Sequence, residues 1–398
     1  MNFYFKFAWM RVINDYIPRS IETTVLQSIK HFPVVAITGP RQCGKSTLIK
    51  HLFPGSDNVV FLDLERPSDL AKLVDAEWFL SSQKGKKICI DEVQRRPEIF
   101  PIIRSLVDEW QLPGSFIILG SASRDLLRQS SETLAGRIVY KRLTPFLFSE
   151  IEKLYTLEDY FSSGGFQRSI LADSAEISFE WRENFIQTFL ERDLLQWSGF
   201  TPATMRRLWQ MLGHVNGQTV NYSSLASSLG ITSVTVKNYI DLLEATYVIE
   251  VILPYTSNLG KRLVKSPKIY ISDSGITTAL LGLKNFEAVS GHPCFGAIWE
   301  QIVLTNVKGH FPNADFLFYR TSNGAEVDFV MLINNKIFVI ECKASYAPVL
   351  SKGNYHAIGD IAPLHTFIVI PSGEEWEMKE GISVVANNNL INKITSFL

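Results

Sequence analysis

Residues 39–47 could bind the phosphates of a nucleoside triphosphate. They read GPRQCGKST, after the apolar run VVAIT and before a helical pattern, which is the order that a phosphate loop requires. Glycines let the backbone turn its N–H groups towards a phosphate, and the following helix adds the positive end of its dipole. Lys45 would reach the β- and γ-phosphates, and the Ser46 hydroxyl would bind Mg²⁺. We therefore predict an ATP site made by Gly39, Arg41, Gly44, Lys45, Ser46 and Thr47.

Two acidic residues end a later apolar run, in the segment ICIDE. Ligands of open α/β sheets bind at the carboxyl ends of the strands, where Asp91 and Glu92 would emerge. Asp91 would hold Mg²⁺ together with Ser46. Glu92 would polarise the attacking water as a general base. Because adjacent acids after a strand are common in loops, the prediction depends on the phosphate loop upstream.

A third set of charged residues lies in EVDFVMLINNKIFVIECKAS, residues 326–345. Asn334-Asn335 suits a two-residue type I′ turn, which would place Asp328 directly across a hairpin from Glu341. Lys343 would lie on the same face, opposite Glu326. Two like charges in an apolar hairpin are costly unless they share a divalent cation. The alternative is an Asp328 solvated at the sheet edge beside a Glu326–Lys343 ion pair.

Three further side chains are candidates for sensing or neutralising phosphate charge. Ser121 ends the apolar run FIILGS and would contact the γ-phosphate or its water, unless it caps the next helix. Arg124 and Arg137 would stabilise charge in the transition state, in the same chain or from a neighbouring subunit. Exposed structural arginines are the alternative for both.

The elements that must position these residues can be read from hydrophobic patterning. Apolar runs at 59–64, 86–93, 116–122 and 137–143 alternate with amphipathic segments, which predicts a parallel sheet covered by helices on both faces. Segments 78–82 and 102–110 are predicted to be parts of those helices.

The middle of the chain has helix-turn-helix features. We expect a helix capped by Ser223 or Ser224 and ended by Gly230, then a second helix starting after Thr232 or Ser233. A strand at 247–253 would form a wing. Few basic residues face outward, but Lys261, Arg262, Lys265 and Lys268 form a downstream cluster that could touch DNA phosphates. A structural or interdomain role is the alternative.

Composition excludes some classes of function. A net charge of −1 over 398 residues gives no overall attraction to nucleic acid or anionic membranes, so DNA binding would need a local patch. The four cysteines lack metal-ligand spacing. The N-terminal stretch lacks the features of a cleaved leader, and no apolar run is long enough to span a membrane. We expect a cytoplasmic protein without membrane contact.

Several of these motifs together resemble a large prokaryotic family. GPRQxGKST, IDEVQ, ILGSAS, LAGRI with TPFLFSE, GGF at 164–166 and FLERDL at 189–194 are similar to proteins that join an AAA+-type ATPase domain to an uncharacterised C-terminal domain. The resemblance runs from about Tyr16 to about Ser345. It implies a sensor strand between the two Walker strands and assembly into a homo-oligomer through an arginine finger. The family usually has Thr where Leu119 stands and a small aliphatic residue where Cys43 stands.

The Asp…Glu-x-Lys spacing near the C-terminus resembles the PD-(D/E)XK nucleases. That resemblance implies Mg²⁺ bound by Asp328 and Glu341, a Lys343 that orients water or stabilises charge, and a further acid at Glu300 in the preceding helix.

The predicted organisation is α/β throughout. Residues 1–150 would form an AAA-like P-loop ATPase domain, 151–265 a helical linker and winged-helix module, and 266–398 a restriction-endonuclease-like α/β domain. We predict an ATPase that uses ATP and Mg²⁺ and acts on DNA. The alternative is a nucleotide-dependent switch or scaffold whose nuclease-like domain is non-catalytic.

Overall fold

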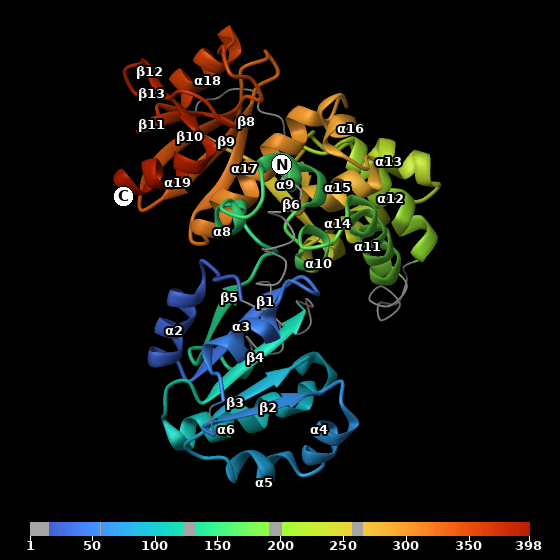
Figure 1. The fold of residues 1–398 in the computed structure, drawn as a ribbon, viewed down its shortest axis with the longest axis vertical. Helices are drawn as coiled ribbons and strands as arrows, with labels where there is room; N and C mark the ends of the chain where they lie inside the picture. The colour runs from blue at the N-terminus through green and yellow to red at the C-terminus, as the bar shows by residue number, and fades with distance from the viewer. Residues whose placement is uncertain (1–15, 56, 122–132, 191–200, 257–265) are drawn as a thin grey trace, which may run out of the picture. The chain divides into compact units, whose positions relative to one another are not determined.

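The chain forms two compact units, residues 1–146 and 147–398 (Figure 1). The computed structural model describes residues 16–55, 57–121, 133–190, 201–256 and 266–398. Arg124, Lys261, Arg262 and Lys265 lie outside these ranges.

The first unit is built on a parallel sheet with the strand order β2-β3-β4-β1-β5. Its strands are β1 Val34–Gly39, β2 Val59–Asp63, β3 Lys87–Asp91, β4 Phe116–Ser121 and β5 Ile138–Arg142. All four runs expected beyond the phosphate loop are strands. Because β4 lies between β1 and β3, the expected sensor strand between the two Walker strands is confirmed.

Alternate residues of these strands pack on opposite faces of the sheet, as strand geometry requires. Val35 and Ile37 of β1 pack with α2 and α3, whereas Val34 and Ala36 pack with α5 and α6. The helices are α2 Glu22–His31, α3 Lys45–Leu52, α4 Pro67–Lys72, α5 Ala76–Ser81 and α6 Phe100–Trp110, with short 3₁₀ turns η1 Val93–Arg95 and η2 Pro97–Ile99. Both predicted covering helices are therefore confirmed.

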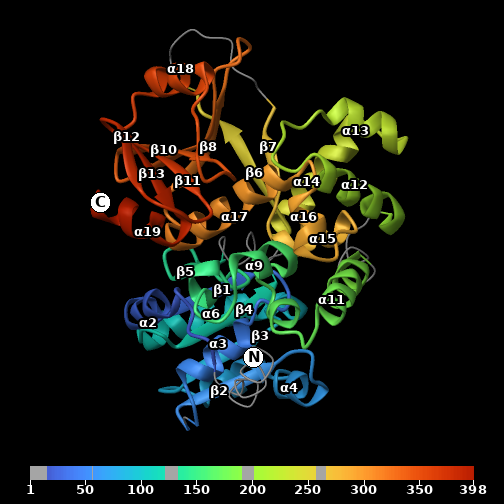
Figure 2. The same ribbon diagram turned by 45° about the horizontal axis from the view of Figure 1, so that its top comes forward.

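The second unit contains a mixed sheet with the strand order β12-β13-β11-β10-β9-β8-β6-β7. Figure 2 labels most of these strands. Its strands are β6 Ile249–Pro254, β7 Lys268–Ile271, β8 Asp315–Arg320, β9 Glu326–Ile333, β10 Lys336–Cys342, β11 His365–Ile370, β12 Trp376–Lys379 and β13 Ile382–Ala386. β6 pairs with β7 and with β8. The strand expected to be a wing is thus part of the same sheet as the C-terminal strands, and the boundary expected at residue 265 falls between two paired strands.

The remaining elements of the second unit are helices, which come before β6 and after β7 in the sequence. Before them come α8 Phe148–Ile151, α9 Leu157–Ser163, α10 Gln167–Ile170, α11 Ala175–Thr188, α12 Pro202–His214, α13 Tyr222–Leu229 and α14 Ser233–Ala245. After them come α15 Ser274–Leu280, α16 Phe286–Ser290, α17 Phe295–His310, α18 Lys352–Ile361 and α19 Asn387–Ser396. Within the described residues, no helix is both long and apolar enough to cross a membrane.

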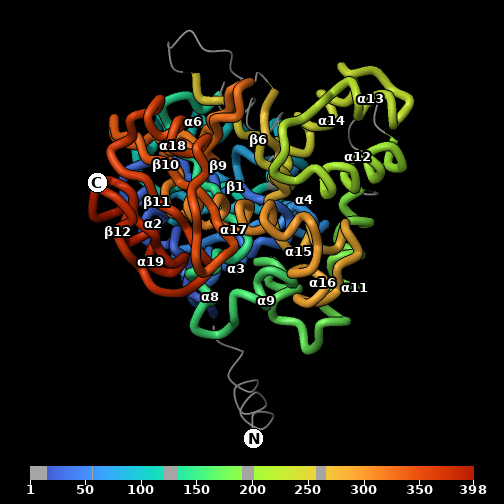
Figure 3. The backbone as a smooth tube through the Cα atoms, turned by 90° about the horizontal axis from the view of Figure 1, so that it is seen from above, coloured from blue at the N-terminus to red at the C-terminus, as the bar shows by residue number. Residues whose placement is uncertain are grey.

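The two helices of the predicted helix-turn-helix are present as α13 and α14. They group with α12 in the yellow-green part of the tube (Figure 3). Thr232 caps α14 and Gly230 ends α13 with a left-handed conformation, as expected. The cap of α13 is different: Asn221, and not Ser223 or Ser224, accepts the N–H of Ser224. The helix starts earlier than expected because the Asn221 side chain already accepts the backbone N–H of Ser224, which has no partner within the helix.

The GGF segment at 164–166 is explained by a buried aspartate. Asp273 accepts hydrogen bonds from the N–H of Gly165 at 2.7 Å and of Ile276 at 3.0 Å. Gly164 has φ +70°, and a Cβ there would lie 2.1 Å from the Asp273 carboxylate. Burial raises the pKa of Asp273 to about 6, although these backbone N–H groups and Arg182 lower it. The segment therefore has a structural role.

The β9–β10 hairpin has the predicted turn and register. Asn334 and Asn335 have φ of 49° and 61°, the left-handed values of a type I′ turn. The pairs run from Ile333–Lys336 to Phe329–Ile340, so the next position brings Asp328 opposite Glu341.

Candidate functional site

The phosphate loop joins β1 to α3 at the carboxyl edge of the first sheet. A Cβ at Gly39 would lie 2.1 Å from the carbonyl oxygen of Leu143, and Gly44 has φ +97° at the cap of α3, so both positions need glycine. The Lys45 ammonium is buried and donates to the carbonyl oxygens of Gly39 at 3.1 Å and Pro40 at 2.9 Å. The lysine thus rests on the loop that would receive the phosphates.

The predicted magnesium ligands lie together. Ser46, in the first turn of α3, donates a short hydrogen bond to the carboxylate of Asp91 at the end of β3. The other Asp91 oxygen accepts the N–H of Glu92 at 3.0 Å. A hydroxyl and a carboxylate side by side are hard oxygen donors, and a cation of this kind takes its remaining ligands from water and phosphate. The residues present therefore fit Mg²⁺.

Glu92 lies beside this pair in an uncommon backbone conformation. Its φ of 55° and ψ of 41° are left-handed, and Gln94 donates to its carboxylate. Burial raises the pKa of Glu92, while the charges of Arg41 and Lys45 lower it. Strained backbone that persists in a folded chain clusters at functional sites. Glu92 therefore carries a feature typical of a catalytic base, and Arg41 is close enough to act on it.

Arg19 was not expected from the sequence, yet it holds the loop from behind. Its guanidinium donates to the carbonyl oxygen of Cys43 at 3.1 Å, of Thr144 at 2.7 Å and of Pro145 at 3.1 Å. It also lies over the ring of Phe146. These contacts fasten the phosphate loop to the last residues of the first unit.

The other phosphate-sensing candidates are placed differently. Ser121 ends β4 and pairs in register with Gly39, so the Ser121 backbone lies at the phosphate loop. The Ser121 side chain is not among the parts of the chain that the structure describes. Thr47 lies in α3 and is exposed. Arg137 precedes β5, at the opposite, amino edge of the sheet, and binds Asp108 at 2.5 Å. The prediction that Arg137 contacts this chain's own nucleotide is therefore not supported, because parallel strands place the residue before β5 far from the loop after β1.

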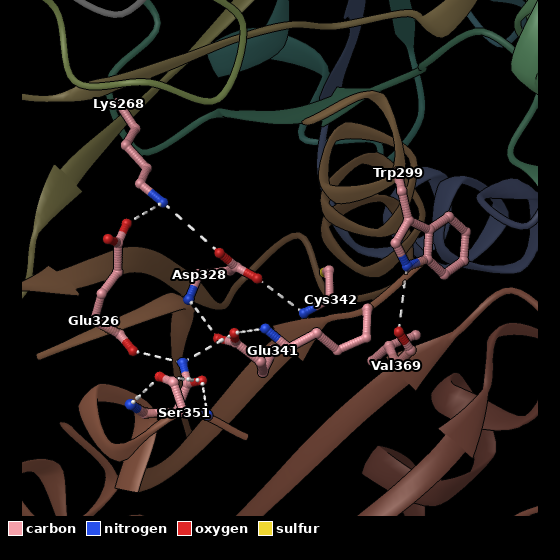
Figure 4. A network of polar contacts seen from close by, with 10 residues as sticks. Lys268, Trp299, Glu326, Asp328, Glu341, Cys342, Ser351 and Val369 are labelled. Atoms are coloured by element: carbon pink, nitrogen blue, oxygen red, sulfur yellow. Dashed lines mark hydrogen bonds and ion pairs between the residues drawn. The ribbon is translucent and has the colours of Figure 1, made fainter. Parts of the chain in front are cut away.

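The second charged site lies on the β9–β10 hairpin (Figure 4). The Asp328 carboxylate accepts the N–H of Cys342 at 2.9 Å, and the Asp328 N–H donates to Glu341 at 3.2 Å. Asp328 is largely buried, so the alternative of an aspartate solvated at the sheet edge is wrong. Nearby, Trp299 of α17 donates to the Val369 carbonyl and holds that helix on the sheet.

Two lysines are not where the sequence suggested. Lys343 was expected opposite Glu326, but β10 ends at Cys342, and the lysine instead binds Glu341 at 2.7 Å. Lys268 was expected in a basic surface cluster. It is 3% exposed and binds Glu326 at 3.0 Å, so it cannot touch DNA phosphates from the surface.

Burial dominates the electrostatics of this site. It raises the pKa values of Glu300, Asp328 and Glu341, and the neighbouring carboxylates of Asp328 and Glu341 add to the effect on Glu300. Glu300 lies in α17 as expected and accepts a hydrogen bond from Tyr270 at 2.7 Å. Burial alone would lower the pKa of Lys268, but the surrounding carboxylates raise it, so the lysine is an ammonium.

With Lys268 and Lys343 in place, the arrangement does not fit a metal ion. Glu341 is already engaged by Lys343 and by Asn354 at 3.0 Å, and both Asp328 oxygens face protein donors. Throughout the described part of the chain, no three His, Cys, Asp or Glu side chains gather in a way that could hold a metal. The cations that balance the carboxylates here are lysines.

Comparison with known protein families divides the chain into three matched regions. Residues 31–152 match an AAA domain. Residues 154–287 and 295–390 match two domains of unknown function, DUF8612 and DUF4143. The first unit is therefore a nucleotide-binding AAA domain of the P-loop type.

Similar proteins are found in bacteria and archaea. An uncharacterised protein of Mycobacterium tuberculosis is 35% identical over 374 residues, which is 94% of this chain and 84% of that protein. The chain belongs to the same family. An uncharacterised protein of Methanocaldococcus jannaschii is 25% identical and matches 68% of this chain and 66% of its own length.

Two solved structures show a weak likeness to this chain. A signal-transduction ATPase with a tetratricopeptide-repeat sensor from Pyrococcus horikoshii is 14% identical with a TM-score of 0.26, over 74% of this chain and about half of that protein (48%). AMPPCP-bound DnaA from Aquifex aeolicus is 15% identical with a TM-score of 0.29, over 56% of this chain and 86% of that one. No functional conclusion follows from either likeness.

Proposed function

We propose that the protein hydrolyses ATP. The observation that carries the proposal is the contact between Ser46 and Asp91 with Glu92 directly beside it, at the carboxyl edge of a sheet with AAA strand order. The contact supports the proposal because it joins a hydroxyl and a carboxylate suited to Mg²⁺, beside a half-buried carboxylate that could accept a proton from water.

Each residue has a separate part in the reaction. Lys45 would leave the carbonyl oxygens of Gly39 and Pro40 and neutralise phosphate charge. Ser46 and Asp91 would hold Mg²⁺, which supplies further charge neutralisation. Glu92 would orient the attacking water and take its proton, and its raised pKa brings it closer to neutral pH, where a general base is most effective.

A pair of variants separates binding from hydrolysis. Glu92→Gln should still bind ATP, because the loop is unchanged, but release no phosphate. Lys45→Ala should lose both. Phosphate release by Glu92→Gln at the wild-type rate would disprove the role given to Glu92. A wild-type protein that binds ATP without hydrolysing it would support the alternative, a nucleotide-dependent switch.

We infer further that the second unit combines a winged-helix region with a PD-(D/E)XK nuclease-like domain that acts on DNA. The register of Asp328 with Glu341, and Lys343 beside Glu341, supports the nuclease-like assignment. The engagement of both carboxylates by protein donors favours the non-catalytic alternative in this conformation. A plasmid-nicking assay with Mg²⁺ or Mn²⁺ distinguishes the two alternatives. Nicking by the wild type that is lost in Asp328→Ala establishes a nuclease. No nicking by the wild type establishes the scaffold.

Assembly into a homo-oligomer through an arginine finger stays a prediction. Arg137 could act only on a neighbouring subunit, and its ion pair with Asp108 would have to open first.

A further inference from the structure

A buried lysine lies inside the acidic site of the second unit. Lys268 is the first residue of β7, and its ammonium lies 3.0 Å from Glu326 and 3.8 Å from Asp328. The ammonium also lies 5.5 Å from the ring centre of Phe318. Figure 4 shows the side chain reaching between the two carboxylates. Neither the phosphate-loop motif nor the Asp…Glu-x-Lys motif includes this residue.

Lys268 and its carboxylate partners come from two strands of one sheet that do not pair with each other. Glu326 and Asp328 are two residues apart on β9, so they share a face of the sheet. β7 reaches that face from the edge of the same sheet. A buried cluster of carboxylates is stable only when cations and hydrogen bonds compensate it. Lys268 supplies this compensation on the Asp328 side, and Lys343 supplies it on the Glu341 side.

We propose that Lys268 is a resident cation that closes the acidic site to divalent metal ions, which can bind only when its ammonium is displaced. This rests on the nuclease-like site proposed above and adds a means of regulating it. The ammonium lies 3.8 Å from the Asp328 carboxylate, and its charge would repel a divalent ion bound to that carboxylate strongly, because the site is buried.

The test is Mn²⁺ binding to the full-length protein without nucleotide, followed by calorimetry and by the thermal midpoint. Lys268→Met keeps the apolar stem but removes the charge, so it should bind Mn²⁺ at least about tenfold more tightly than wild type and gain thermal stability from the ion. Lys268→Arg retains the charge and should bind as weakly as wild type. Adding Asp328→Asn to Lys268→Met should abolish the gained affinity.

Two outcomes would overturn the proposal: equal Mn²⁺ affinity in wild type and Lys268→Met, or a gain that persists after Asp328→Asn. If Lys268→Met does not fold, Lys268→Met with Glu326→Gln removes one charge of each sign, and the same comparison applies to it. Plasmid nicking is measured in the same proteins. Nicking by the wild type without a gain in Mn²⁺ binding by Lys268→Met refutes the role of Lys268 alone. A gain in Mn²⁺ binding without nicking by any of the proteins refutes the nuclease alone.

Discussion

Arg19 gives a direct test of how the phosphate loop is kept ready for nucleotide. Arg19→Met retains the aliphatic length of the side chain but removes the hydrogen bonds to Cys43, Thr144 and Pro145 and the contact with the Phe146 ring. We expect the first unit to lose stability and the loop to lose affinity for ATP.

The size of both effects follows from the three hydrogen bonds. A bond from a charged donor contributes about 1.5–3 kcal/mol, and bonds made by one group are not additive. The expected loss in the free energy of unfolding is therefore about 3 kcal/mol. The bond to Cys43 is one of the three, so the cost to the loop is about 1 kcal/mol, which corresponds to about fivefold weaker ATP binding.

Urea unfolding followed by circular dichroism measures the first effect. Calorimetric titration with a non-hydrolysable ATP analogue, at a temperature where the variant is folded, measures the second. Arg19→Lys is the matched control, because an ammonium can keep one of the carbonyl contacts and should give an intermediate result. A variant that is destabilised but binds the analogue with wild-type affinity would refute the link between Arg19 and the phosphate loop.

Three further predictions follow from the described residues. Because burial raises the pKa of Glu92, the acid limb of the pH profile of phosphate release should lie above pH 4.5, the ordinary value for this group; a limb at or below that pH contradicts the assignment. Asn335→Ala should lower the free energy of unfolding by about 1 kcal/mol in urea, because alanine disfavours positive φ, whereas Asn335→Gly should not. Asp273 has a folded-state pKa of about 6, above its unfolded value, so the folded state binds the proton more tightly. Stability should fall as pH rises from about 4 to about 6, by roughly 3 kcal/mol, and urea titrations of Asp273→Asn should lack this slope.

Local chemistry could be predicted from the sequence because it depends on neighbouring residues. The phosphate loop is specified within eight positions, and Asn334-Asn335 sets the register that brings Asp328 to Glu341. The position of Arg137 could also have been predicted from the sequence. A residue that precedes a parallel strand must lie at the amino edge of the sheet, away from the phosphate loop.

Long-range contacts could not be predicted in the same way. Lys268 meets Glu326 across 58 residues of chain, and the sequence around it reads only as a basic segment. Arg19 reaches Thr144 across 125 residues. Neither pairing leaves a periodic or spacing signal, because it arises from how the elements pack and not from the pattern within one of them.

The central claim is tested most directly by phosphate release from ATP, measured with the full-length protein in the presence and absence of double-stranded DNA. We expect release by the wild-type protein, none by Glu92→Gln, and faster release when DNA is present. A wild-type protein that releases no phosphate under either condition would contradict the ATPase.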